Sequence, residues 1–181
     1  MRNSEKLVSD VRLLQVAMSE PKIVNPNCKV FAIMNGASHG TTKGGIPIGS
    51  ASGQSTKAGK SKSQKSASGT GMPLPMEVVS ADNLAAESMD YLTLLYGLAR
   101  EEVFALFCNN IAHFNKMLES LNHEPERFID DIRKGTISTE LPEELRNQLE
   151  ESWKPNPERA EKLEMLWQEK KSIKVEDIWP H

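Results

Sequence analysis

The chain has 181 residues, 38% of them hydrophobic and 26% charged, with a formal net charge of −3. This length suits one domain, and the slight negative charge argues against a general nucleic-acid binder. No apolar run reaches the ~18 residues of a transmembrane helix, and the N-terminus lacks the apolar core of a secretory signal. We therefore expect a cytoplasmic protein without nucleic-acid or membrane partners.

The cysteines and histidines show no metal-binding pattern. Cys28 and Cys108 each lie in an apolar, strand-like run, so we expect buried free thiols in a reducing compartment. The histidines lack ligand spacing such as i, i+4, so we predict no metal site. The four histidines are His39, His113, His123 and His181.

The first third of the chain predicts a helix, a strand and a glycine-rich loop. Apolar residues recur at helical spacing over 4–19, and residues 28–34 form an apolar run typical of a strand. The loop that follows contains Thr42 and Lys43 among glycines. Such loops can bind phosphate through backbone N–H groups, but Lys43 does not stand in the G-K-[ST] triplet of a Walker loop.

Residues 49–71 are rich in Ser, Gly and Lys, and they cannot bury enough apolar area to offset the entropy of ordering. We expect a flexible loop there. Beyond it, 77–80 predicts a short strand or sheet edge, and 83–99 predicts a helix capped by Ser80 or Asp82 with an apolar stripe on one face.

The central stretch predicts strand, turn, helix, helix. Residues 103–107 form an apolar run, and Cys108, Asn109 and Asn110 interrupt it. Asn109 or Asn110 can cap the helix that follows. A strand end followed by a helix N-terminus is where open α/β sheets bind ligands. The inward residues of this helix are predicted to be Ile111, Phe114, Met117, Leu118 and Leu121.

A second helix is predicted to end at Gly135, which is free to adopt positive φ, with Asp130 and Asp131 facing outward. Glu101, Glu102, Asp130 and Asp131 could be proposed as acid–base pairs. Carboxylates at i, i+1 point in different directions, however, so we interpret them as solvated.

The last third predicts two more helices. Pro142 suits a first helical turn, and Lys154-Pro155 ends that helix. Asn156-Pro157 then begins another helix, with Asn as cap and Pro at the first position.

Several of these segments carry a family resemblance. Ile129–Ser138 reads IDDIRKGTIS, Lys154–Ala160 reads KPNPERA, and Ile178-Trp179-Pro180 follows near the end. In this order they resemble the auxin-responsive acyl-acid amido synthetases, plant-type and bacterial, which are adenylate-forming ligases. The resemblance implies an α/β fold, namely part of the ligase N-terminal domain across 1–181, with few strands and five or six helices.

The family reaction is ATP-dependent adenylation of a carboxylic acid, followed by amide formation with an amino acid. The resemblance implies ATP and Mg²⁺ for the full-length family, but the three nucleotide-binding motifs of the family are not found here. We therefore assign no catalytic residue and no bound cofactor, expect the chain to be inactive alone, and leave open whether it is an enzyme.

By position, the resemblance implies that part of the acyl-acid pocket is formed by Phe107, Cys108, Asn109 and Asn110. The segment Thr42–Pro47 resembles a family loop at the rim of this pocket, so Thr42 and Lys43 are expected loop contacts, with direct phosphate contact as the alternative. The expected partners are a small carboxylic acid and the remainder of a synthetase. Two other readings stay open: a stand-alone small-carboxylate binding module, or a subunit of a split enzyme. The acyl acid and the amino acid are not determined.

Overall fold

The computed structural model describes residues 29–33, 40–46, 48, 74–81, 84–108 and 110–180. The predicted helix over 4–19 and the predicted flexible loop over 49–71 lie outside these residues, so both stay predictions. The described part consists of two strands and seven helices. Their bounds are β1 Lys29–Ile33, α3 Met76–Ser80, α4 Ala86–Leu98, β2 Val103–Cys108, α5 Ile111–His123, α6 Pro125–Lys134, α7 Glu143–Ser152, α8 Pro157–Lys170 and α9 Val175–Ile178.

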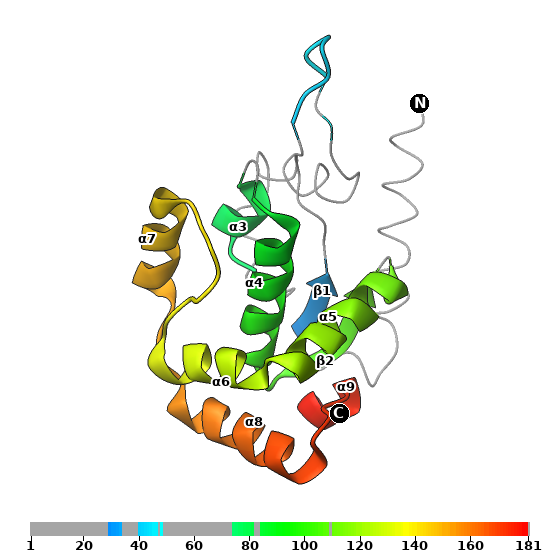
Figure 1. Ribbon diagram of the computed structural model, residues 1–181, viewed down its shortest axis with the longest axis vertical. Coiled ribbons are helices and arrows are strands. Elements are labelled where there is room, and N and C mark those ends of the chain that lie inside the picture. Colours follow the sequence, from blue (N-terminus) through cyan, green and yellow to red (C-terminus); the bar gives the residue numbers. More distant parts are fainter. Residues whose placement is uncertain are drawn as a thin grey trace.

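Helix α4 is the centre of the packing. Every residue from Tyr91 to Leu98 is buried, and so are Ser88 and Met89 before them. The sequence predicted a helix with one apolar stripe, whereas a helix buried on all sides belongs to the interior of a domain. Figure 1 shows why: α4 runs through the middle of the molecule, with α7 on one side, the strands on the other and α6 below it.

The two strands are parallel neighbours. β1 and β2 pair in register from Val30 opposite Ala105 to Ile33 opposite Cys108. Parallel strands need a crossover connection, and here the chain between them includes α3 and α4. The strands lie directly against α4, because Gly97 leaves room for the Phe31 ring: a Cβ at Gly97 would stand 2.7 Å from Phe31 Cζ.

Helices α6 and α8 form a lower layer beneath α4, while α5 lies beside the strands and α7 beside α4 (Figure 1). α6 lies along α8, and α4 contacts both α5 and α6, as Figure 1 shows. Their inward faces carry the residues that the helical spacing predicted. Buried predicted residues include Phe114, Met117, Leu121, Phe128, Ile129, Ile132, Leu145, Leu149, Ala160 and Leu163.

One predicted element has the wrong type. Residues 77–80 were predicted as a strand, but they belong to α3, which begins after Pro75 and buries Val78 and Val79. The two valines favour a strand locally, and the helix prevails because it packs both of them against the core beside α7. Ser80 is therefore helical rather than a cap, and α4 begins after Ala85 without a side-chain cap.

Three predicted helix ends are confirmed. The Asn110 side chain accepts from the His113 N–H at the start of α5, and Asn156 does the same for Arg159 at the start of α8. Gly135 ends α6 with φ of 69°. The prediction of a few strands among many helices is also confirmed; the helix count rises through α3 and the four-residue α9, which the periodicity did not predict.

Candidate functional site

The end of β2 forms a tight turn held by a thiol. The Cys108 Sγ donates to the Asn110 carbonyl oxygen at 3.0 Å and accepts from the Asn110 N–H at 3.3 Å. Cys108 is partly buried and Asn110 is exposed. The turn therefore curls around the sulfur at the carboxyl end of a parallel strand, with the N-terminus of α5 directly after it.

The same turn fixes a histidine. Asn110 Oδ1 accepts from the His113 N–H at 3.2 Å, which sets the first turn of α5. The His113 ring then reaches α4, where Nε2 lies 2.9 Å from Asp90 Oδ1. Both side chains are partly exposed, at 28% for His113 and 29% for Asp90. The turn, α5 and α4 thus meet at one partly open place.

The environment of Asp90 is unfavourable for its charge. Burial raises the pKa of the Asp90 carboxyl above its ordinary value, and Glu87 acts in the same direction. The charge and hydrogen bond of His113 and the charge of Lys116 lower this pKa and offset part of the rise. His113 and Lys116 therefore offset only part of the effect of burial on Asp90.

An apolar side chain stands beside the turn. Ile111 was predicted to face inward, but it is 66% exposed. The prediction was wrong because Ile111 is the first residue of α5, and the buried stripe begins one turn later at Phe114. Ile111 thus presents an apolar surface next to the polar groups of Asn110 and His113.

The loop that contains Thr42 and Lys43 lies elsewhere. Residues 40–46 form a tight hairpin, in which the Thr42 N–H donates to the Ile46 carbonyl oxygen at 2.8 Å and the Ile46 N–H donates to Thr42 Oγ1 at 3.0 Å. Thr42 and Lys43 are exposed. Figure 1 shows the hairpin, in cyan, projecting far beyond the ends of β1 and β2. The structure does not bring Thr42 and Lys43 to the turn after β2.

Of the four predicted pocket residues, the structure brings together Cys108 and Asn110. Asn109 lies outside the described residues. Phe107 pairs with Ala32 in the sheet, and its side chain is not among those described. His113 joins the site although the sequence analysis did not single it out. The cap at Asn110 was the available signal, because it places the residue three positions later in the first helical turn.

The acidic segment proves to be a structural element. Asp131 was predicted to face solvent, but it is 1% exposed. Its carboxylate accepts four hydrogen bonds, from Tyr91 Oη, Thr136 Oγ1, the Ser138 N–H and Ser138 Oγ, at 2.6 to 2.7 Å. Periodicity alone missed this, because the donors that compensate the buried carboxylate come from α4 and from the loop after α6.

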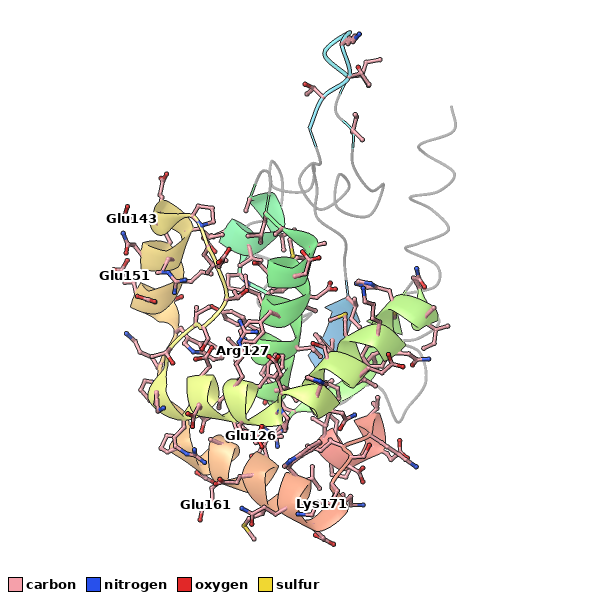
Figure 2. The ribbon with its side chains drawn as sticks, viewed as in Figure 1. Glu126, Arg127, Glu143, Glu151, Glu161 and Lys171 are labelled. Atoms are coloured by element: carbon pink, nitrogen blue, oxygen red, sulfur yellow. The ribbon has the colours of Figure 1, made fainter. Side chains whose placement is uncertain are left out.

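Tyr91, one of these donors, is itself held on both faces. The ring of Phe128 stacks on it at a centroid distance of 4.5 Å, and the Arg127 guanidinium lies 4.3 Å from its centroid. Figure 2 shows Arg127 in this position between α6 and α4. The DIRKGTIS segment therefore fastens α6 and its following loop to the central helix, rather than carrying chemistry.

The other acidic residues are surface groups, as predicted. Asp130 contacts Arg133 at 3.0 Å and Lys134 at 2.8 Å, and Glu101 contacts Lys162 at 2.9 Å. Within the described part of the chain, no three His, Cys, Asp or Glu side chains are placed to hold a metal ion. Among the helices that the structure describes, none has the length and apolarity to cross a membrane.

The parallel strand pair and the helices packed around it define an α/β domain. A family model described as the GH3 family N-terminal domain matches residues 3–181. The chain belongs to the GH3 family, which confirms the resemblance to the auxin-responsive acyl-acid amido synthetases.

A solved structure supports the fold. The chain is similar to a GH3.15 acyl acid amido synthetase, with a TM-score of 0.67 and 18% sequence identity. The match covers 97% of this chain and 31% of that one, so the chain spans about a third of the length of the structure that it matches. At this identity the likeness shows the fold. None of the curated proteins compared with the chain matches it.

Proposed function

We propose that this chain provides part of the acyl-acid pocket of an acyl-acid amido synthetase, at the turn between β2 and α5. The observation that carries the proposal is the group formed by Cys108, Asn110 and His113 at the carboxyl end of a parallel strand. Ligands of α/β sheets bind at this end of the strands, and a helix N-terminus favours a negatively charged group.

The chemistry of the surface suits a small carboxylic acid. The polar side chains of Asn110 and His113 can orient a carboxylate, and the exposed Ile111 can contact an apolar body. Small-molecule sites combine apolar walls with a few oriented polar groups in this way. The turn residues Cys108 and Asn110 differ from the small-residue turn of many plant family members, so we propose no indole acid in particular.

In this proposal the complete synthetase activates the acid with ATP and transfers the acyl group to an amino acid in the cytoplasm. Among the described residues, no three His, Cys, Asp or Glu side chains are placed to hold Mg²⁺. The nucleotide-binding motifs of the family are not found in the sequence, and we expect the chain alone to give no acid-dependent ATP–pyrophosphate exchange.

The alternative is a stand-alone carboxylate-binding module or a subunit of a split enzyme. The observation behind this alternative is that the match covers only 31% of the synthetase chain. Carboxylate binding is common to all three readings, so binding is the first property to measure.

The test is a titration of the ¹⁵N-labelled chain with benzoate and with hexanoate, followed by two-dimensional NMR. We expect saturable shifts centred on the amides of Cys108, Asn110, Ile111 and His113. Benzyl alcohol, which lacks the carboxylate, should give no saturable shift. Shifts centred on another part of the chain would contradict the proposal. So would the absence of saturation at ~20 mM acid, because this concentration is high enough to detect a dissociation constant of ~5 mM.

A matched pair of variants tests the apolar contact. Ile111→Ser should weaken binding by about threefold to tenfold, as removal of one apolar contact does. Met165→Ser removes a side chain of similar exposure, 63% against 66%, on α8, and it should leave the affinity unchanged. Equal losses in the two variants would contradict the assignment of Ile111 to the site.

A further inference from the structure

The loop directly after α6 presents two hydroxyl-bearing residues to solvent. Residues 136–140 are not helical, and exposed residues alternate with buried ones along them. Thr136 and Ser138 are exposed, whereas Ile137 and Thr139 are buried. This alternation is typical of an extended segment, in which successive side chains point to opposite sides. Thr136 and Ser138 therefore lie on one outward face of the loop.

The hydroxyls of the same two residues compensate a buried charge. Thr136 Oγ1 donates to Asp131 Oδ1 at 2.7 Å, and Ser138 Oγ donates to the same oxygen at 2.6 Å. The Ser138 N–H and Tyr91 Oη donate to the other oxygen, Oδ2. Asp131 is 1% exposed, so a buried carboxylate depends on donors from residues that solvent can reach. A buried charge that loses its donors is strongly unfavourable.

Two cations precede Thr136 in the chain. Arg133 and Lys134 stand three and two positions before it, and their side chains are 35% and 60% exposed. For Ser138 the same cations lie five and four positions away. Protein kinases select a hydroxyl by the pattern of charges that flanks it. Thr136 thus combines an exposed position in an extended segment with two cations directly before it.

We propose that Thr136 is a phosphorylation site for a protein kinase that recognises basic residues, and that its phosphate releases the loop after α6 from Asp131. The kinase transfers the terminal phosphoryl group of a nucleoside triphosphate. An O–P bond forms at Thr136 Oγ1, the bond from the terminal phosphorus to the bridging oxygen breaks, and the nucleoside diphosphate leaves. The hydroxyl proton passes to the base of the kinase. The inference does not depend on the proposed acid site.

The phosphate acts on Asp131 in two ways. It removes the O–H that donates to Asp131 Oδ1, and it adds about 1.5–2 negative charges to an oxygen that lies 2.7 Å from that carboxylate. Like charges this close to a buried carboxylate repel each other. The two preceding cations are already paired, Arg133 with Glu164 at 2.7 Å and Lys134 with Asp130 at 2.8 Å. The loop therefore moves outward and takes the Ser138 donors with it.

The first experiment treats the folded full chain with ATP, Mg²⁺ and the catalytic subunit of cyclic-AMP-dependent protein kinase, which selects basic residues before its target. Mass spectrometry of proteolytic peptides locates the phosphoryl groups. We expect Thr136 to be modified and Thr139, which donates to Ser88 Oγ at 3.1 Å, to stay unmodified. In Arg133→Gln the initial rate at Thr136 should fall about tenfold, as loss of one charged contact does. Lys162→Gln on α8 should leave this rate unchanged.

The second experiment measures what the phosphate does to the loop. We expect phosphorylation to lower the midpoint of urea unfolding by about 1 M. The Ser138 amide, which donates to Asp131 Oδ2, should exchange its hydrogen about tenfold faster or more, as NMR can measure. Thr136→Val is the matched control, because it removes the same hydrogen bond without adding a charge. Both of its effects should be smaller.

The outcomes decide between release and no release. An unmodified Thr136 in the folded chain, with the kinase active on its standard peptide substrate, overturns the proposal. Modification that survives at full rate in Arg133→Gln contradicts recognition of the preceding cations. A phosphorylated chain that unfolds and exchanges like Thr136→Val shows that the charge does not release the loop. Modification at Thr136 with larger effects than in Thr136→Val supports the proposal, and the acid-binding test stays separate from all of these results.

Discussion

Asp130 and Asp131 are neighbours in the chain, yet they lie in opposite environments. Asp130 is at the surface beside Lys134, whose hydrogen bond lowers the pKa of the Asp130 carboxyl. Asp131 is buried and accepts four hydrogen bonds from three residues. A buried carboxylate is tolerated only when such donors surround it. Single polar residues therefore decide how the loop after α6 is attached to α4.

This contrast gives a prediction at the scale of the residue. Asp131→Asn replaces one acceptor oxygen by an N–H₂ group that faces donors, and we expect it to lower the free energy of unfolding by about 2–4 kcal/mol. Asp130→Asn, the adjacent control, should cost about 0.5 kcal/mol or less. Urea unfolding followed by circular dichroism measures both. Similar losses in the two variants would mean that the four donors do not depend on the carboxylate.

The ends of the helices position whole elements. α6 ends at Gly135 in the left-handed region, where the Gly135 and Thr136 N–H groups both donate to the Asp131 carbonyl oxygen. The chain after α7 crosses this point, since the Asn156 N–H donates to the Ile132 carbonyl oxygen at 2.8 Å. Gly135 thus lets two elements, α6 and the start of α8, approach each other closely.

At the scale of the element we predict that Gly135→Ala is destabilising by about 2 kcal/mol or more, because positive φ alone costs about 1–2 kcal/mol for a residue with a Cβ. The added Cβ would also stand 2.7 Å from the Pro155 nitrogen. Gly135→Asn separates the two causes, since Asn tolerates positive φ but still carries a Cβ. Gly44→Ala is the control: its Cβ would meet nothing closer than 3.9 Å. Thermal unfolding ranks the three variants, and an Asn variant as stable as the parent would exclude the Pro155 contact as a cause.

Arg159 joins parts of the molecule that are far apart in the sequence. Its buried guanidinium donates from Nε to the Leu98 carbonyl oxygen at 2.7 Å, and from Nη2 to the Arg100 and Ile178 carbonyl oxygens at 3.4 and 3.3 Å. Trp179 Nε1 also donates to the Arg100 carbonyl oxygen, and the Trp179 ring packs on Phe31 of β1. α8, α9, the end of α4 and the sheet are therefore tied together at one point.

At the scale of the whole molecule we predict that Arg159→Met lowers the free energy of unfolding by about 3 kcal/mol, because it leaves buried carbonyl groups without donors. We expect the variant to exchange backbone hydrogens faster than the parent chain, and the increase should be larger in the α9 peptide than in the α5 peptide. Hydrogen exchange followed by mass spectrometry measures this difference. Lys162→Met, which removes an exposed partner of Glu101 from the same helix, is the control. Unchanged exchange in α9 would contradict the role of Arg159 as a tie.

Sequence reasoning went furthest where the determining interactions are local. The caps at Asn110 and Asn156, the stop at Gly135 and, apart from Ile111, most of the buried faces of α5 to α8 follow from neighbours a few positions away, and the structure confirms them. It failed at Val78 and Val79, where packing overrides strand propensity, and at Asp131, whose compensation comes from Tyr91, forty positions earlier. Of the candidate site, the sequence predicted the turn at Cys108 and Asn110 but not the partnership of His113 with Asp90.

The sequence by itself determined the order of most helices and of the two strands, and the residues that begin and end the helices, because propensity, capping and apolar spacing act within a few residues. Its motifs also carried the family resemblance, which the match to the GH3 family N-terminal domain confirms. Only the tertiary structure decided that α4 lies at the centre, that Asp131 is buried, that the hairpin with Lys43 stands apart from the strand end, and that Asp90 meets His113. The physical reason is common to all four: burial and charge compensation depend on groups that the fold brings together from distant positions.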